Sequence, residues 1–348
     1  MKSKPPAAGR LMISVLSKEN RRRMPTRRNF LKTATLAGLS LPLARSSSLF
    51  RWTRPSMSIA AALLEPLAGE TLITILHTND THSQIDPILE NDKTYAGKGG
   101  VARRATLVKR VRKENPNTLL IDAGDVLQGT PYFNFYKGEV EYKAMSMIGY
   151  DAGTIGNHEF DNGVESLAKA MSFANFDIVS TNYDVRGSAL ESRVKTHAVK
   201  EVGGVRVGLF GLGIRPEGLI TADNFKPLKY LDPVRMSRGV VKLLREQERC
   251  ALVLGMSHLG YYPNPQRDEV GDTQVAAQVD GIDFIASGHT HTFMEKPVLQ
   301  KTPDGKDTII FQVGRSGIYV GRVDFTLRDG KVTAYAGRLL DLRDESLA

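Results

Sequence analysis

The sequence predicts an α/β protein in which two mixed sheets pack face to face and helices cover their outer faces. With 348 residues, of which 41% are hydrophobic and 24% charged, the chain is long and apolar enough for a large core. From residue 71 to residue 180, strand-like runs alternate with helix-like runs, which is typical of parallel pairing. Beyond residue 195 the pattern changes to consecutive strands, which indicates a second sheet.

The first half of the predicted domain is expected to alternate strand and helix regularly. Residues 71–76 are rich in Thr, Ile and Leu, which favours a strand. Leu107, Val108 and Val111 recur at helical spacing, which favours a helix. By these criteria the first half holds strands 71–76, 118–121, 151–155 and 177–180, and helices 100–113, 142–147 and 164–173.

The second half begins with a predicted hairpin. Gly203 and Gly204 separate two alternating runs, and paired glycines suit the positive φ angles of a two-residue hairpin turn. No internal repeat or low-complexity segment interrupts the chain after residue 70, so residues 66–348 are predicted to form one domain. Its remaining elements are expected to be strands 195–200, 205–211, 251–256, 282–286, 308–313, 317–327 and 331–339, and helix 233–249.

Positive charge is concentrated at the N-terminus. The formal net charge is +9, but residues 1–55 hold thirteen Lys or Arg residues and one acidic residue, so this segment carries +12 and the remainder −3. A mildly acidic body argues against a nucleic-acid-binding surface on the folded domain. Cys250 is the single cysteine, which excludes an internal disulfide and a lipid-anchored N-terminal cysteine.

The basic N-terminal segment resembles a twin-arginine export signal at about residues 24–45. Arg27 and Arg28 precede a weakly apolar stretch of about a dozen residues, which is too short for a stable membrane span of about 20 residues. Met24 is an alternative start, and a basic tail without export function is the alternative interpretation. Residues 1–65 are therefore predicted to be an export leader and linker with an unassigned cleavage site, and the protein is predicted to be periplasmic or otherwise exported.

Polar side chains follow five of the predicted strands, at the point where each strand ends. Because the carboxyl ends of parallel strands meet at one edge of a sheet, these side chains are expected to converge there. An ordinary hydrogen-bonded histidine is the alternative at any one position, but five loops together favour a shared site. The residues concerned are Asp80 and His82, Asp125, Asn157 and His158, His258, and His289 and His291.

This mixture of donors suits a pair of divalent cations. Two cations about 3.5–4 Å apart need a bridging carboxylate, further oxygen and imidazole ligands, and room for water and substrate. The ligands present suffice if Asp125 is counted at both cations. Gly124, Gly156 and Gly288 are expected to let the backbone turn sharply, so that the neighbouring ligands face the metals.

The segment 156–161 combines ligand and proton-transfer chemistry. Asn157 offers an amide oxygen, His158 an imidazole that can donate a proton, and Asp161 a carboxylate placed to orient that imidazole. The alternative is a Gly-Asn turn with an ordinary surface histidine. Glu159 either supports the site indirectly or caps the following helix, and capping is the favoured role.

These runs resemble the signature of the calcineurin-like metallophosphoesterases. The flanks 75–80 and 157–163 are similar to the 5′-nucleotidase branch of that family, which includes periplasmic UDP-sugar hydrolases. The resemblance covers residues 71–340, so it identifies the domain 66–348 as a metallophosphoesterase catalytic domain and implies that family's four-layer α/β/β/α sandwich. The matching runs are, in order, Asp80-x-His82, Gly124-Asp125, Gly156-Asn157-His158-Glu159, His258 and Gly288-His289-Thr290-His291.

The resemblance implies a role for each candidate residue. Asp125 would bridge two metals, and His158, oriented by Asp161, would stabilise the transition state and assist the leaving group. A hydroxide held between the metals would attack phosphorus in line, and the O/N ligand set suits Mn, Zn, Fe or Co. One metal would be held by Asp80, His82 and His291, and the other by Asn157, His258 and His289.

Two departures from the branch bear on the prediction. Some of its nucleotidases carry Gln at the position of His291, which changes one ligand without removing it. Members usually carry a C-terminal domain that stacks on the nucleobase, and because the sequence ends at Ala348 this nucleotide clamp is predicted to be absent. Either a separate nucleotide-binding partner supplies it, or the substrate is read by its phosphate alone. His77 is expected to pack beside the site, and His197 to lie outside it.

The predicted function is hydrolysis of phosphate esters of nucleotides by an exported two-metal enzyme, a 5′-nucleotidase-like phosphomonoesterase. The alternatives are a cyclic-nucleotide phosphodiesterase, a UDP-sugar hydrolase, or a catalytic subunit that needs the separate partner. A non-catalytic metal-binding subunit is disfavoured, because the ligands are intact and are accompanied by His158 and Asp161. The expected partner is a nucleotide or other phosphate ester, with no nucleic acid and no stable membrane span.

Overall fold

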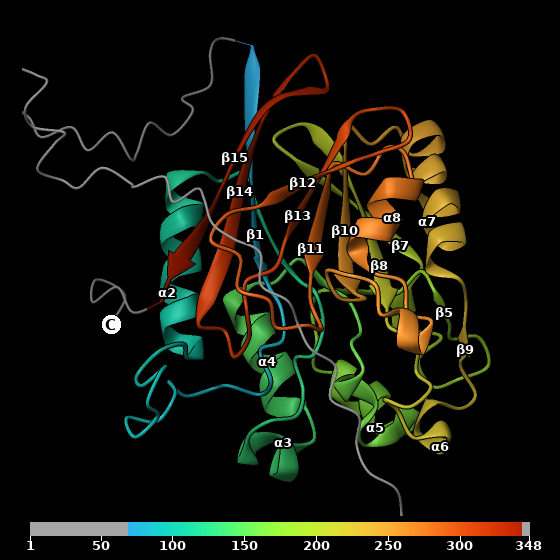
Figure 1. Ribbon diagram of the computed structural model, residues 1–348. Coiled ribbons are helices and arrows are strands. Elements are labelled where there is room, and N and C mark those ends of the chain that lie inside the picture. The colour runs from blue at the N-terminus through green and yellow to red at the C-terminus, as the bar shows by residue number, and fades with distance from the viewer. Residues whose placement is uncertain (1–68, 343–348) are drawn as a thin grey trace, which may run out of the picture. The chain divides into compact units, whose positions relative to one another are not determined.

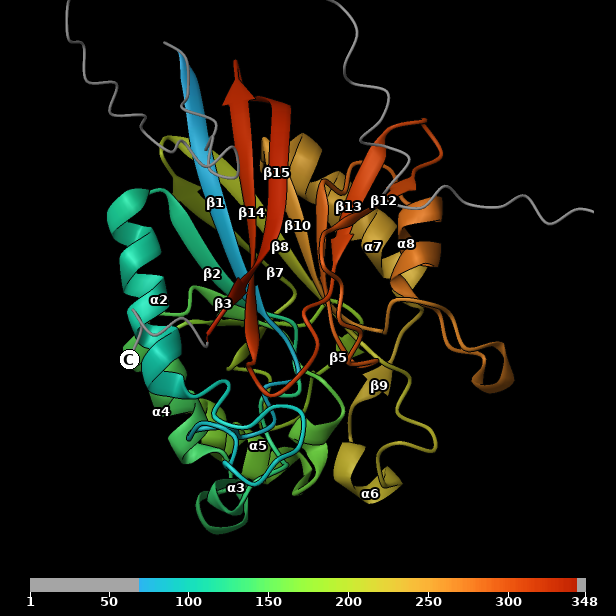
Figure 2. The same cartoon turned by 60° about the vertical axis from the view of Figure 1, so that its left-hand side comes forward.

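A computed structural model describes residues 69–342, in which two large sheets lie between layers of helices (Figures 1 and 2). The predicted four-layer α/β/β/α fold is confirmed. The export signal predicted at residues 24–45 lies outside the described residues. No helix within residues 69–342 has the length and apolar character needed to cross a membrane.

The first sheet has seven strands in the order β15-β14-β1-β2-β3-β4-β6. The five strands from β1 to β6 run parallel, and β14 and β15 add an antiparallel edge. Of the predicted strand 151–155, only two residues pair with neighbouring strands. The strands are β1 (Glu70–Thr78), β2 (Thr118–Asp122), β3 (Ala152–Gly153), β4 (Asp177–Val179), β6 (Val194–Lys195), β14 (Tyr319–Arg328) and β15 (Lys331–Asp341).

The second sheet has six strands in the order β12-β13-β11-β10-β8-β7, with antiparallel strands at both edges. The predicted hairpin is confirmed: Gly203 and Gly204 join β7 to β8 with φ angles of 58° and 76°. A separate two-stranded ribbon pairs β5 (Tyr183–Asp184) with β9 (Lys229–Tyr230). The strands of the second sheet are β7 (His197–Val202), β8 (Val205–Gly213), β10 (Leu252–His258), β11 (Phe284–Ser287), β12 (Val298–Lys301) and β13 (Asp307–Phe311).

The helices cover the outer faces of the two sheets. Helices α2, α4 and α5 pack on the first sheet, whereas α7 and α8 pack on the second (Figure 1). The predicted helix 233–249 is shorter than expected, because α7 ends at Lys242 and the chain continues as a wider π turn, Leu243–Gln247. The helices are α2 (Val101–Glu114), α3 (Pro131–Tyr136), α4 (Glu139–Ile148), α5 (Gly163–Met171), α6 (Ala222–Phe225), α7 (Pro233–Lys242) and α8 (Asp272–Gln278), with short 3-10 turns at His158–Phe160 and Pro265–Arg267.

Three apolar layers hold the four structural layers together. Between the sheets, Ile121 and Val323 from one side meet Leu254 from the other, all fully buried. A second cluster lies under α2, α4 and α5, and a third lies under α7 and α8. Burial of this apolar surface is the main favourable term in folding, and it fixes the strand ends from which the functional loops start.

Candidate active site

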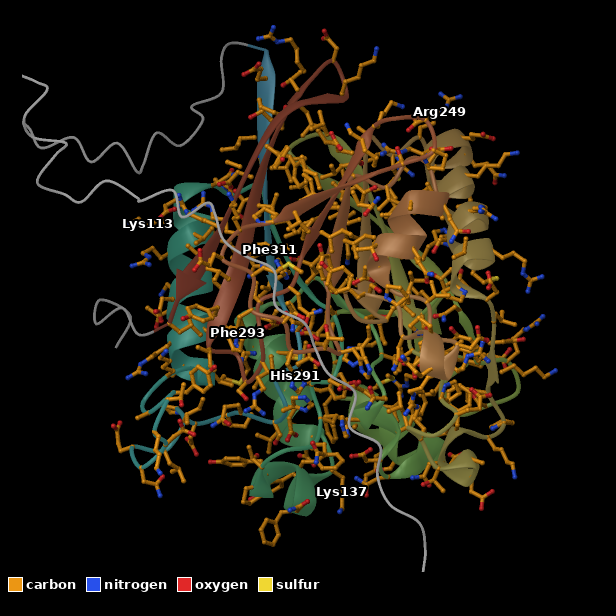
Figure 3. The ribbon with its side chains drawn as sticks, in the orientation of Figure 1. Lys113, Lys137, Arg249, His291, Phe293 and Phe311 are labelled. Carbon is orange, nitrogen blue, oxygen red and sulfur yellow. The ribbon has the colours of Figure 1, made fainter. Side chains whose placement is uncertain are left out.

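The candidate residues gather at one end of the molecule, where the carboxyl ends of strands from both sheets meet. Asp80 and His82 follow β1, Asp125 follows β2, and Asn157 follows β3 in the first sheet. From the second sheet, His258 is the last residue of β10, and the loop after β11 supplies His289 and His291. Figure 3 places His291 in this region, below the strand layer in that view.

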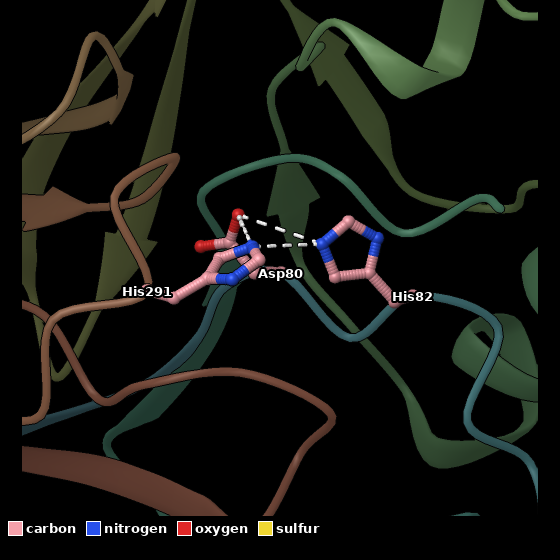
Figure 4. Close-up of side chains that lie close together, drawn as sticks. All are labelled: Asp80, His82 and His291. Atoms are coloured by element: carbon pink, nitrogen blue, oxygen red, sulfur yellow. Dashed lines mark hydrogen bonds and ion pairs between the residues drawn. The ribbon is translucent and has the colours of Figure 1, made fainter. Parts of the chain in front are cut away.

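The first group of converging side chains consists of Asp80, His82 and His291 (Figure 4). The Nε2 atoms of His82 and His291 lie 2.9 Å apart, and Nε2 of His291 lies 3.4 Å from Oδ1 of Asp80. Asp80 is fully buried, whereas the two imidazoles are partly exposed. Two imidazole nitrogens and a carboxylate oxygen therefore converge closely enough to hold one ion.

The second group consists of Asp125, His258 and His289. The Nδ1 atom of His258 donates to the carbonyl of Ala123 at 2.8 Å, so in the neutral imidazole the lone pair lies on Nε2. That Nε2 lies 3.0 Å from Oδ2 of Asp125 and has no hydrogen-bond partner among the described residues. Oδ1 of Asn157 lies 3.0 Å from Nδ1 of His289, which adds an amide oxygen to the group.

The donor atoms within each group suit a bound divalent cation better than they suit direct contact with one another. A carboxylate and an imidazole lone pair that face one another at 3.0 Å, as Asp125 and His258 do, need a proton or a cation between them. The donors are carboxylate, amide oxygen and imidazole, the set that Mn, Fe, Co and Zn accept. Oδ2 of Asp125 is also 4.0 Å from Nε2 of His82, so this carboxylate lies between the two groups.

The pKa values of the buried groups reflect this crowding. Burial opposes a charge on His258, but the nearby charges of Asp125 and Asp80 raise its pKa to about 10. Burial also opposes ionisation of Asp125, yet the adjacent His258 holds its pKa below the usual range. Burial, with the charge of His258, lowers the pKa of His289 to about 4, so this imidazole is neutral and available as a ligand near pH 7.

The backbone of the ligand loops is strained. Asp80, His82, Asp125, His289 and His291 have φ angles between 47° and 72°, the left-handed region that side chains other than glycine rarely adopt. Each such residue costs about 1–2 kcal/mol, and strain of this kind concentrates at functional sites. The sequence pattern does not reveal it, because these residues are not glycines.

The three glycines beside the ligands do not share one backbone conformation. Gly124 does have a positive φ of 89°, but Gly156 and Gly288 do not. A Cβ on Gly156 would lie 2.2 Å from Oδ1 of Asp125, and one on Gly288 would lie 2.9 Å from the carbonyl of Ala123. These two positions therefore need glycine for close packing of the loops rather than for a positive φ.

His158 and Asp161 form the predicted pair. Nδ1 of His158 lies 3.0 Å from Oδ2 of Asp161, and this hydrogen bond raises the pKa of the imidazole. Its backbone N–H donates to Oδ1 of Asp125 at 2.8 Å, and its ring lies 5.4 Å from that of His82. With Nδ1 held by Asp161, Nε2 is the nitrogen that can exchange a proton with a ligand.

Glu159 does not cap the following helix, so that prediction is wrong. Its buried carboxylate reaches back and accepts four backbone N–H bonds, at 3.0 Å from Asp125, 2.7 Å from Val126, 3.2 Å from Leu127 and 2.6 Å from Gly156. It thereby joins the loop after β2 to the loop after β3. The indirect supporting role was the alternative, and these bonds favour it.

Gln312 is a supporting residue that the sequence did not single out. Its fully buried amide donates from Nε2 to Oγ of Ser287 and to the carbonyl of Gly288, both at 2.7 Å, and its Oε1 accepts from the backbone of Thr292. These bonds fix the loop that carries His289. The available signal was a glutamine at the end of an apolar strand, just before Gly314.

The two remaining histidines lie where they were expected. His77 is fully buried between the sheets, where its ring packs edge-on against Phe284 and Phe311 at 5.4 and 5.2 Å. Burial lowers its pKa to about 3, so it packs as a neutral ring. His197 lies at the start of β7 and belongs to neither donor group.

Comparison with known proteins connects the described domain to phosphoesterases. The family model for calcineurin-like phosphoesterases matches residues 73–293. Snake venom 5′-nucleotidase from Gloydius brevicauda is 32% identical over 298 residues, which cover 79% of this chain and 49% of that protein. The 5′-nucleotidase of Bos taurus is 32% identical over 311 residues, which cover 82% of this chain and 52% of that protein.

Solved structures agree with the sequence relatives. The structure of a 5′-nucleotidase precursor from Thermus thermophilus superposes with a TM-score of 0.69 at 34% identity, and the match covers 78% of this chain and 54% of that one. The chain spans about half the length of the curated relatives it matches.

Proposed function

Because the chain belongs to the calcineurin-like phosphoesterase family and is a metal-dependent phosphoester hydrolase, we propose that it releases phosphate from nucleotides as a 5′-nucleotidase-like phosphomonoesterase. One observation carries the proposal: two groups of donor side chains lie next to each other, with the carboxylate of Asp125 between them and the His158–Asp161 pair beside them. The donor groups would hold the cations that stabilise the phosphoryl oxygens, and the His158–Asp161 pair would give a proton to the leaving oxygen.

Residues at the carboxyl ends of five strands would hold two divalent cations. Asp80, His82 and His291 would hold one, Asn157, His258 and His289 the other, and Asp125 would contact both. Two bound cations supply positive charge to the phosphoryl oxygens and activate water for in-line attack. Their buried, low-dielectric surroundings strengthen that charge stabilisation.

His158 would give a proton to the leaving oxygen. Its hydrogen bond to Asp161 raises the pKa of the imidazole, which favours the protonated form needed for this step. Asp161 also fixes the ring orientation, so that Nε2 carries the proton that is transferred. Both side chains are about one-third exposed, 34% and 35%, so a substrate can reach them.

Phosphate release by the purified protein tests the proposal. The protein is stripped of metal, reloaded with Mn²⁺ or Zn²⁺, and assayed on AMP, a UDP-sugar, a cyclic nucleotide and p-nitrophenyl phosphate. We expect metal-dependent release with AMP preferred, loss of activity in Asp125→Ala, and strongly reduced turnover in His158→Ala. Preference for the cyclic nucleotide or the UDP-sugar would replace the monoesterase assignment, and no release on any substrate with metal bound would refute it.

We also propose that the protein is exported through the segment 24–45. The paired arginines Arg27 and Arg28 before an apolar stretch support this, as does the separation of a basic leader from an acidic body. Expression with Arg27→Lys and Arg28→Lys together is expected to leave the protein uncleaved in the cytoplasm. Cell fractionation and N-terminal sequencing would show it, and equal export of the variant would refute the assignment.

A further inference from the structure

A buried carboxyl group near the second donor group has no part in the chemistry described so far. Asp272 is the first residue of α8, and it is fully buried. An aspartate is rarely placed in the interior unless bound partners compensate for its lost hydration. Within residues 69–342 its side chain is hydrogen-bonded to a neighbouring strand rather than to the first N–H groups of α8. Stabilisation of the helix end therefore does not account for its burial.

Asp272 is bound to the residue that precedes a candidate metal ligand. Its Oδ1 accepts the hydroxyl of Ser257 at 2.5 Å, and Oγ of Ser257 in turn accepts the backbone N–H of Leu259 at 3.3 Å. Ser257 and Leu259 are the neighbours of His258 in the chain. The N–H of Asp272 also donates to the carbonyl of Gly260 at 2.9 Å. The backbone on both sides of His258 is therefore held to the start of α8.

The next strand brings a second buried serine to the same place. Ser257 and Ser287 are partners in the parallel pairing of β10 with β11, and both are fully buried. Oγ of Ser287 accepts Nε2 of Gln312 at 2.7 Å, so its own proton is free to be donated. Burial raises the pKa of Asp272 to about 7, and hydrogen bonds from Ser257 and Ser287 counteract the rise. No group within residues 69–342 binds Oδ2 of Asp272 at close range, so the bond to Ser257 is the stronger of the two.

These contacts lead mainly to one of the two donor groups. His258 follows the first serine directly, His289 follows the second by two residues, and both belong to the group that includes Asp125. The other group takes only His291 from the second sheet, and its remaining donors follow β1 in the first sheet. A change at the carboxyl group should therefore affect one cation more than the other.

We propose that Asp272 is a positioning residue for the second donor group. By accepting the hydroxyl of Ser257, it holds the ends of β10 and β11 at the spacing at which His258 and His289 bind one cation. The inference rests on the proposed function for the two cations themselves. Because an acceptor oxygen is what the serine needs, Asp272→Asn retains the contact and Asp272→Ala removes it.

Binding of Mn²⁺, followed by the electron paramagnetic resonance signal of the free ion, measures both sites without relying on hydrolysis. We expect wild type to bind two cations. Loss of a residue that hydrogen-bonds a metal ligand lowers metal affinity by about 10- to 100-fold, and because Asp272 acts through Ser257 we expect Asp272→Ala to weaken one cation by about 10-fold. The other cation should be unaffected, and Asp272→Asn should bind both as wild type does. Ser257→Ala removes the same bond with a smaller change, and should reproduce the loss if Asp272→Ala does not fold.

Asp283→Asn is the matched control, because Asp283 joins the same two strands at their amino ends. Its Oδ2 accepts the N–H of Val253 at 2.7 Å and is paired with Arg245. This variant should be less stable to urea but should bind both cations with unchanged affinity. Adding Asp272→Ala to His258→Ala, in which the second group is already broken, should weaken Mn²⁺ binding no further.

The outcomes separate this inference from the proposed function. If wild type binds two cations but hydrolyses nothing, the proposed function fails, and selective loss of one cation in Asp272→Ala still supports the positioning role. Unchanged binding in both Asp272→Ala and Ser257→Ala, equal weakening of both cations, or an equal loss in Asp272→Asn would overturn the inference. Fewer than two cations bound by wild type would overturn it together with the assignment of the donor groups.

Discussion

Glu159→Gln tests whether one buried carboxylate fixes the loop that carries Asp125. The native carboxylate accepts two backbone N–H groups at each oxygen, from Asp125 and Gly156 at Oε2 and from Val126 and Leu127 at Oε1. Glutamine keeps the size but only one oxygen, so two N–H groups lose their acceptor and face another donor. An unpaired buried donor costs about 1–3 kcal/mol, so the free energy of unfolding is expected to fall by about 2–6 kcal/mol.

Urea unfolding of the metal-free protein measures this loss, because bound cations would add their own stabilisation. Phosphate release by the reloaded variant should fall as well, since the backbone that orients Asp125 is no longer held. Glu165→Gln is the matched control: Glu165 is exposed on α5, and its free energy of unfolding should change by less than about 0.5 kcal/mol. A Glu159→Gln protein with wild-type stability and activity would show that the four bonds do not position the loop.

Three further predictions concern the same site. Asp125→Ala should weaken the binding of both cations, measured by calorimetry, by more than about 100-fold. Even the loss of a residue that only hydrogen-bonds a metal ligand lowers metal affinity by about 10- to 100-fold. In Asp161→Asn, loss of the hydrogen bond that raises the pKa of His158 should move the alkaline limb of the kcat–pH profile to lower pH, because the protonated imidazole is the active form; an unmoved limb would remove His158 as the acid. Gly156→Ala places a Cβ 2.2 Å from Oδ1 of Asp125, and should lower stability to urea by about 1–3 kcal/mol and reduce metal uptake, unlike Gly239→Ala on α7, whose added Cβ meets no atom within 4 Å.

The order and type of the main elements could be predicted from the sequence because the apolar pattern changes period where the fold changes element. Strand β2 and helix α2 match their predicted ranges to within one residue at each end. Helix α3 and strand β12 were not predicted, since six and four residues are too few to show a period. The π turn after Lys242 continues a helical pattern, and nothing in the residue types marks where the hydrogen bonding widens.

The residue types of the candidate site could be predicted, but the contacts that hold them could not. Asp80, His258 and His289 are recognisable because polar groups that end apolar strands share an edge. The bonds from Glu159 join it to the loop after β2, 32 to 34 residues away, and those from Gln312 join it to the end of β11 and the loop that follows, 24 to 25 residues away. Such partners depend on how two loops meet in space, which no local pattern encodes.

Three of the ligand residues are more deeply buried than the His158–Asp161 pair, and this difference follows from their separate tasks. Asp80, Asp125 and His258 are at most 2% exposed, where a low dielectric strengthens their attraction for cations. His158 and Asp161 are about one-third exposed, because a group that hands a proton to a leaving oxygen must be reached by substrate and reprotonated by solvent.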